Sequence, residues 1–95
     1  MNDTPFNVGR IVLSTQGRDK GRFFIIVEVV NDNFVLLADG DLRKLEKPKL
    51  KKIKHLRATK FIANNFIDKL NNKVLVLNSD LRKEIKHYTD VKEVC

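Results

Sequence analysis

A charged loop between two apolar segments constrains the fold of this chain more than any other feature. Val8 to Ser14 predicts a short first strand, and Arg22 to Val30 carries the strongest strand pattern, because its odd positions are all apolar. The loop between them, Thr15 to Lys20, is bracketed by Gly17 and Gly21, which permit a tight turn. This order is typical of the corner of a small β-barrel, with charged loop side chains pointing outward.

A hairpin follows the first two predicted strands. Asn31-Asp32-Asn33 predicts a turn, because these residues tolerate left-handed backbone, and Phe34 to Ala38 returns as the partner strand. Asp39-Gly40-Asp41 predicts a further turn, whose carboxylates we expect to orient Arg43 or Lys44. The chain therefore continues as a meander of short strands.

The next segment contains two candidate strands. Arg43 to Glu46 is expected to form a short edge strand that ends at Pro48, whose ring removes a ladder donor. Lys51 to Arg57 fits either a helix or a closing strand, since Ile53 and Leu56 lie three residues apart while the lysines alternate. The β-rich surroundings favour the strand.

After Arg57 the hydrophobic period becomes that of an amphipathic helix. We expect a first helix with Thr59 as its N-cap and Asn71-Asn72 at its end, and a second helix capped by Ser79. Their buried side chains would be Phe61, Ile62, Ala63, Phe66, Ile67 and Leu70 in the first, and Leu81, Ile85 and Tyr88 in the second. Residues 1–58 are thus predicted to form a barrel and residues 59–95 a helical extension packed on it.

The positive charge of the chain is concentrated in one stretch. The formal net charge is +7, and Arg43 to Lys60 holds nine Lys or Arg against one acid, Glu46. The rest of the chain is therefore close to neutral. A patch this concentrated repels itself unless an anion is present, and its field draws polyanions.

Several classes of function are disfavoured. No apolar run approaches the length of a membrane span, and the N-terminus has no signal-peptide pattern. One cysteine, Cys95, allows no internal disulfide, which fits a reducing, cytoplasmic compartment. His55 and His87 lack partners at zinc spacing, and no catalytic constellation is present. We expect a protein without enzymatic activity, cofactor or metal, which is a monomer when free.

Two blocks of sequence resemble a known family. Gly9-Arg10-Ile11-Val12 and Gly17 to Arg22, followed by an apolar strand, resemble the KOW domain of ribosomal proteins and NusG-type elongation factors. Leu37 to Lys49 and Lys51 to Leu56 are similar to the short KOW-containing RNA-binding proteins of Gram-positive bacteria, which in turn resemble L14e-type large-subunit ribosomal proteins. The resemblance implies a Src-homology-3-like five-stranded barrel and binding of RNA, with ribosomal RNA and ribosomal proteins as the expected partners.

In a KOW-type barrel the first loop is the usual RNA contact, which here predicts Gln16, Arg18, Lys20 and Arg22. The lysine-rich block adds Arg43, Lys44, Lys47, Lys49, Lys51, Lys52, Lys54, His55, Arg57 and Lys60. The alternating Lys47, Lys49 and Lys51 would form a rail for backbone phosphates, which positions RNA without reading its sequence. Phe24 and Phe34 are both expected in the core, so recognition of folded RNA shape is favoured over stacking on bases.

Explanations of these charges that involve no RNA binding stay open at this point. Arg18 and Asp19 could pair within the loop with Lys20 solvated, and the lysine-rich block could be a solvated face. A different class of function is a protein-interaction adaptor that docks on a ribosome or transcription component. Attachment to an anionic membrane is disfavoured, because Lys47 to Lys60 lacks an aromatic and apolar amphipathic face.

Overall fold

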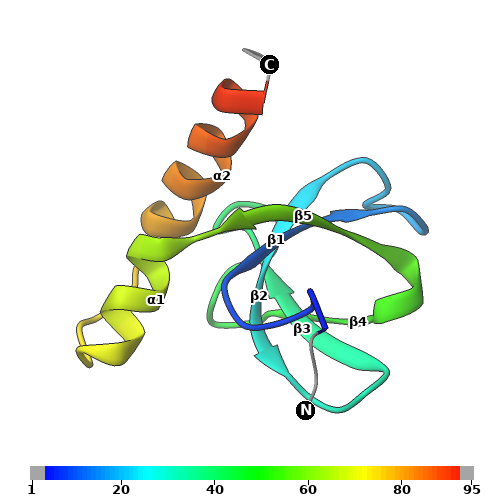
Figure 1. The fold of residues 1–95 in the computed structure, drawn as a ribbon, viewed down its shortest axis with the longest axis horizontal. Coiled ribbons are helices and arrows are strands. Elements are labelled where there is room, and N and C mark those ends of the chain that lie inside the picture. The colour runs from blue at the N-terminus through cyan, green and yellow to red at the C-terminus, as the bar shows by residue number, and fades with distance from the viewer. Residues whose placement is uncertain (1–3, 93–95) are drawn as a thin grey trace.

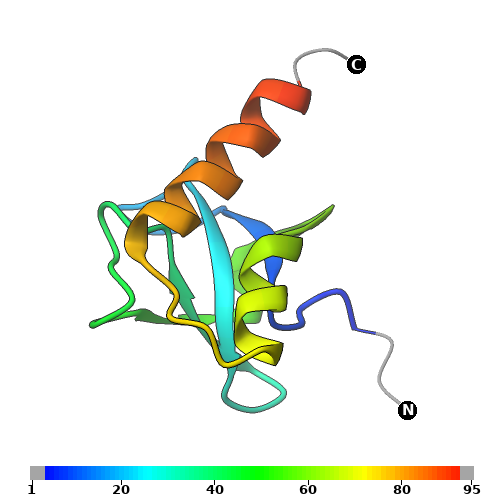
Figure 2. The same cartoon turned by 90° about the vertical axis from the view of Figure 1, so that its left-hand side faces the viewer.

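A computed structural model describes residues 4–92 of the chain, so Cys95 lies outside the described residues. One five-stranded antiparallel sheet carries two helices on one side (Figures 1 and 2). The strands are β1 (Arg10–Ser14), β2 (Phe23–Val29), β3 (Phe34–Ala38), β4 (Lys49–Lys52) and β5 (Leu56–Ile62). A 3-10 turn (Ile53–His55) joins β4 to β5, and the helices are α1 (Asn64–Asn71) and α2 (Asn78–Lys92).

The sheet has the order β4-β3-β2-β1-β5, so β4 and β5 are its two edges. Among residues 4–92 no ladder pairs β4 with β5, and the predicted closed barrel is therefore not confirmed. The sheet nevertheless curls, and its two edges approach each other at the 3-10 turn (Figure 1). The mainly β fold with five strands and two helices is confirmed. The division at residue 58 stays a prediction, and that residue lies inside β5.

Alternation along the strands sends apolar side chains to two separate cores. On one face, strand residues alone form the sheet core: Val12, Phe24, Ile26, Val35, Leu37 and Leu56. On the other face, strand and helix residues together form the helix-facing core: Ile11, Ile25, Ala38, Ala63, Phe66 and Leu81. Each large apolar side chain buried in this way stabilises the fold by about 1.5–3 kcal/mol. The helices thus cover β1, β2 and the end of β3 at Ala38, and leave the start of β3 outside this core.

The predicted helix start at Thr59 is wrong. Thr59 and Phe61 belong to β5, and α1 begins at Asn64. The Thr59 hydroxyl donates to the carbonyl oxygen of Ile11 at 2.6 Å, which ties this residue to β1. The apolar spacing from residue 61 onward fits both periods, and pairing with β1 decides for the strand.

Two other local predictions also need correction. Arg43 to Glu46 forms turns in place of an edge strand, because the backbone N–H of Leu45 donates to the Asn78 side chain at 2.8 Å. Lys51 to Arg57 is neither one strand nor one helix: β4 ends at Lys52 and β5 starts at Leu56. In α2, the predicted buried stripe of Leu81, Ile85 and Tyr88 is confirmed, although the helix begins at Asn78 and not after a cap at Ser79.

Gly40 locks the turn after β3 onto the second helix. Its φ is +79°, and a side chain there would collide with the carbonyl group of Asn78 at the start of α2. The Arg82 guanidinium donates to the Gly40 carbonyl oxygen at 2.6 Å. Only glycine combines this backbone conformation with so close an approach. The turn at residues 39–46 is therefore part of the helix-bearing side of the molecule.

Candidate nucleic-acid interface

The loop between β1 and β2 is organised around a buried carboxylate, Asp19, which is 2% exposed. Its Oδ1 accepts a hydrogen bond from the Ser14 hydroxyl at 2.9 Å and one from Lys51 Nζ at 3.0 Å. Lys49 Nζ lies 3.2 Å from the other carboxylate oxygen, Oδ2. Lys51 Nζ also donates to the carbonyl oxygen of Gln16 at 2.7 Å. One acid thus fastens the loop to strand β4.

The ionisation of Asp19 follows from these contacts. Burial acts to raise the pKa of its carboxyl group, but the hydrogen bonds from Lys51, Ser14 and Lys49 outweigh burial and lower the pKa to about 2. Asp19 is therefore charged at every physiological pH. The alternative in which Arg18 and Asp19 pair within the loop does not hold, since two lysines of β4 pair with Asp19.

Strand β4 divides its lysines between two faces. Lys49 and Lys51 lie on the same side, as the predicted rail requires, but that side faces Asp19 and not solvent. Lys51 is 7% exposed, whereas its neighbour Lys52 is exposed on the opposite side of the strand. This placement argues against a part for Lys49 and Lys51 in RNA binding.

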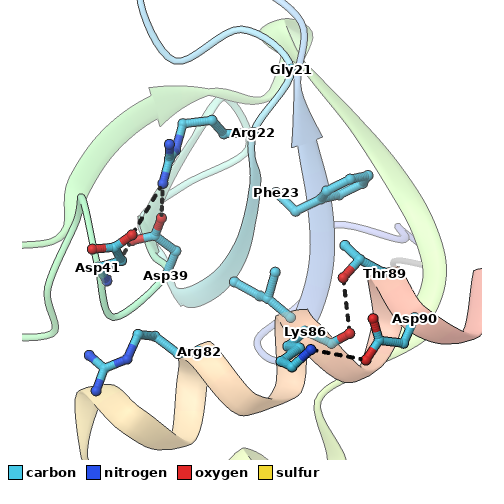
Figure 3. A pocket seen from close by; sticks show the side chains of 10 residues that line it. Gly21, Arg22, Phe23, Asp39, Asp41, Arg82, Lys86, Thr89 and Asp90 are labelled. Carbon is cyan, nitrogen blue, oxygen red and sulfur yellow. Dashed lines mark hydrogen bonds and ion pairs between the residues drawn. The ribbon is translucent and has the colours of Figure 1, made fainter.

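Arg22, at the end of the same loop, is also engaged. Its guanidinium Nη2 lies 3.3 Å from Asp39 and 3.7 Å from Asp41 (Figure 3). Asp39 in turn accepts hydrogen bonds from the backbone N–H groups of Asp41 and Arg43, at 3.0 and 2.8 Å. The predicted role of Asp39 in a turn is confirmed. The side chain that it orients is Arg22, in place of Arg43 or Lys44.

The first part of the lysine-rich block lies away from the rest of it. Residues 43–47 pack against the start of α2, where Glu46 accepts a hydrogen bond from the Asn78 side chain at 2.8 Å. Arg43 is half-buried and its Nε is enclosed, while Lys44 and Lys47 are exposed. The first part of the predicted basic block therefore lies beside α2, whereas the 3-10 turn lies on the side away from the helices (Figure 1).

Four of the remaining predicted cations lie on two segments of the chain that meet, the β1–β2 loop and the segment around the 3-10 turn. The backbone N–H and the hydroxyl of Thr15 both donate to the His55 carbonyl oxygen at 2.9 Å, so the β1–β2 loop lies beside the 3-10 turn. Both segments lie on the side away from the helices (Figure 1). We name the exposed side chains of Arg18, Lys20, Lys52 and Lys54 the basic corner. Among the described residues, none of these four forms an ion pair with an acid.

Four other predicted residues lie outside the basic corner. His55 is half-buried, and burial together with the charges of Lys54, Lys51 and Lys52 lowers the pKa of its imidazole. The Gln16 side chain is exposed in the loop. Arg57 and Lys60 are exposed on the edge strand β5, beside an apolar cavity of 500 Å³ that reaches Tyr88 of α2.

The sequence analysis missed the structural place of two residues of the candidate site. Asp19 lies between two cations of the glycine-bounded loop, and nothing in that local pattern indicated its pairing with the lysines of β4. Phe24 is in the core as predicted, but Phe34 is not: it is half-exposed and opposite Lys52. Its place three residues before the buried Leu37 gives it the opposite strand parity, which was the signal available.

The described part of the chain contains neither a metal-binding cluster nor a helix that could span a membrane. In residues 4–92, no three side chains of His, Cys, Asp or Glu come close enough to hold a metal ion. Within the same range, neither helix combines the length and apolarity that crossing a membrane requires.

Part of the chain is similar to archaeal ribosomal proteins. It is 42% identical over 52 residues to the large ribosomal subunit protein eL14 of Desulfurococcus amylolyticus, covering 55% of this chain and 54% of that protein. It is 53% identical over 30 residues to eL14 of Hyperthermus butylicus, covering 32% of this chain and 31% of that protein. The chain thus spans about half or less of these relatives, and no protein-family model matches it.

Proposed function

We propose that this chain is a non-catalytic, ribosomal-protein-like RNA-binding protein that binds structured ribosomal RNA through the basic corner. The observation that carries the proposal is the gathering of Arg18, Lys20, Lys52 and Lys54 at one end of the sheet, where no acid neutralises them among the described residues. The similarity to eL14 supports ribosomal RNA as the polyanion. A cytoplasmic location and ribosomal protein neighbours belong to the same proposal.

The basic corner suits an RNA backbone for electrostatic reasons. Arginine engages phosphate with two parallel hydrogen bonds, and lysine adds a point charge. The net positive charge of the Asp19 cluster, one carboxylate with two lysines, adds to the local potential without direct contact. Such contacts position an RNA and carry no sequence information by themselves. The KOW-type identity of the sheet and the Gram-positive grouping stay predictions.

Salt dependence tests the proposal. Binding of large-subunit ribosomal RNA is measured over a salt series for the unmodified chain and for a variant with Arg18→Gln, Lys20→Gln, Lys52→Gln and Lys54→Gln. We expect the slope of log K against log[salt] to fall in magnitude by about 3, since each phosphate contact contributes about 0.7–0.9.

The matched control removes four exposed lysines elsewhere, with Lys44→Gln, Lys47→Gln, Lys73→Gln and Lys83→Gln. It changes the net charge equally and should keep most of the slope. Equal loss in both variants would mean that net charge alone drives binding, and the basic corner would not be the interface.

A second candidate function is docking on a protein, and one feature favours it. The last turn of α1 exposes Leu70, and the connector to α2 exposes Val74, Leu75 and Leu77, with Leu75 at 75%. Exposed apolar groups in one segment are typical of contact surfaces. Leu75→Ser with Leu77→Ser tests this function, because it would release an adaptor from its protein partner while leaving RNA affinity unchanged.

A further inference from the structure

Phe34 differs from every other phenylalanine in the chain. Phe24 and Phe66 belong to the two cores, and Phe6, Phe23 and Phe61 pack against them. Phe34 does neither, although it lies in β3, where it pairs with Lys52 at the end of the edge strand β4. An aromatic ring that lies outside the core of so small a protein leaves apolar area available for contact with a ligand.

The ring lies on the part of the outer face that the helices leave uncovered. Its partner across the strands is Lys52, and the two side chains therefore stand on the same side of the sheet. Asn33, Phe34, Lys52 and Lys54 line a cavity of 310 Å³ there. This is a volume that accommodates one flat heterocycle next to the ring.

The backbone around this cavity is held in place before any ligand arrives. The Asn31 side-chain oxygen accepts hydrogen bonds from the backbone N–H groups of Asn33 and Phe34, at 2.8 and 2.9 Å. The N–H of Ile53 donates to the Asn33 carbonyl oxygen at 2.8 Å, which joins the hairpin turn to the 3-10 turn. The four lining residues come from two segments that are thus fixed to each other.

We propose that this cavity binds one unpaired nucleobase of the RNA, and the inference rests on the proposed function. The Phe34 ring stacks on the face of the base, which is sequence-tolerant because every base has a π-face. Lys52 and Lys54 neutralise the phosphates on either side, and the Asn33 amide, exposed at the rim, hydrogen-bonds a base edge. Recognition then combines RNA shape with one splayed base, which replaces the expectation of shape alone.

Charge favours RNA over a protein segment as the occupant. Two of the four lining side chains are lysines and a third is an amide, so an apolar peptide would lose hydration from both ammonium groups. A nucleotide instead supplies an apolar face for Phe34 and an anionic backbone for the lysines.

The test uses two RNA hairpins of equal phosphate number, one fully paired and one with a single unpaired adenosine replaced by a fluorescent analogue. The unmodified chain should bind the bulged hairpin more tightly and quench the analogue. Phe34→Ala should lose about tenfold in affinity for the bulged hairpin, with no change for the paired one. Phe34→Tyr should retain both affinity and quenching, while Phe34→Leu, which keeps an apolar strand residue, should lose the quenching.

The outcomes separate this inference from the proposed function. If Phe34→Ala quenches the analogue as the unmodified chain does, or if Phe34→Leu retains full quenching, the base-binding cavity is refuted while RNA binding stands. If the unmodified chain binds neither hairpin more tightly than a DNA duplex of equal charge, both the proposed RNA binding and the base-binding cavity are refuted. Loss of protein binding but not of RNA binding in Phe34→Ala would assign the cavity to a protein partner, and overturn the inference.

Discussion

Two neighbouring pairs of lysines have opposite surroundings in this molecule. Lys49 and Lys51 point to the buried Asp19 and tie β4 to the β1–β2 loop. Lys52 and Lys54 are exposed at the same end of the sheet and have no acidic partner among the described residues. The two pairs lie only a few residues apart in sequence. One pair is engaged by an acid within the fold, and the other is available to bind an anion.

The difference arises from strand parity and from one carboxylate. Successive side chains of β4 point to opposite faces, so Lys51 and Lys52 lie on opposite sides of the sheet. Asp19 then engages the inward pair, because a buried carboxylate is stable as a charge only with partners. A count of positive residues therefore overstates the binding surface, and each lysine needs its own structural assignment.

The largest effect is expected from removing the shared acid. Asp19→Asn should lower the free energy of unfolding by about 2–4 kcal/mol, because the lysine ammonium groups at 3.0 and 3.2 Å lose their counter-charge. Urea denaturation measures the loss. Asp32→Asn, an exposed acid in the hairpin turn, is the control and should change stability by less than about 0.5 kcal/mol. Equal effects would show that Asp19 does not organise the loop.

Acid should act on the same cluster. The folded pKa of Asp19 is lowered from 3.8 to about 2, so its contribution is complete above pH 3.8 and is lost as the pH falls through about 2. The contribution is about 2 kcal/mol. The free energy of unfolding of the unmodified chain should therefore converge on that of Asp19→Asn across this range. A constant gap between the two curves down to pH 2 would contradict the account.

Single substitutions at adjacent lysines should separate the two roles. Lys51→Gln should lower stability by about 1–3 kcal/mol and leave the salt slope of RNA binding unchanged, because its Nζ serves Asp19 and Gln16. Lys52→Gln should leave stability within about 0.5 kcal/mol and reduce the slope by about 1. Urea denaturation and the salt series of RNA binding, applied to both variants, measure the two effects. An equal loss of slope in both would restore Lys51 to the RNA surface.

The smallest effect concerns His55. Burial and three nearby lysines lower the pKa of its imidazole in the free chain. RNA phosphates at Lys52 and Lys54 would offset the lysine charges, so binding should raise this pKa and take up protons near neutral pH. NMR titration of the ring proton, with and without RNA, measures the change. An unchanged His55 titration on RNA binding would mean that no phosphate approaches these lysines.

Much of the fold was predictable from local pattern. The strand from Phe34 to Ala38 and the buried stripe of α2 follow from period and turn chemistry alone. The end of β5 was not, because residues 59–62 satisfy both helical and strand spacing until β1 supplies a partner. Tertiary pairing, which a single segment does not encode, made that choice.

The candidate site was predictable only in outline. The glycine-bounded loop and the lysines near the 3-10 turn do meet at one end of the sheet, as a shared surface requires. Which lysines are engaged depends on Asp19, more than thirty residues away from Lys51 in sequence. Long-range ion pairs of this kind leave no periodic trace in a sequence.

RNA binding at the basic corner is tested by ultraviolet crosslinking of the full chain in its native cells, followed by sequencing of the RNA and mapping of the crosslinked peptides. We predict one cluster of ribosomal RNA sites, attached through peptides that contain Arg18 to Lys20 or Phe34 and Lys52 to Lys54. No enrichment over a charge-matched control protein, or crosslinks confined to Lys44 and Lys47, would contradict the account.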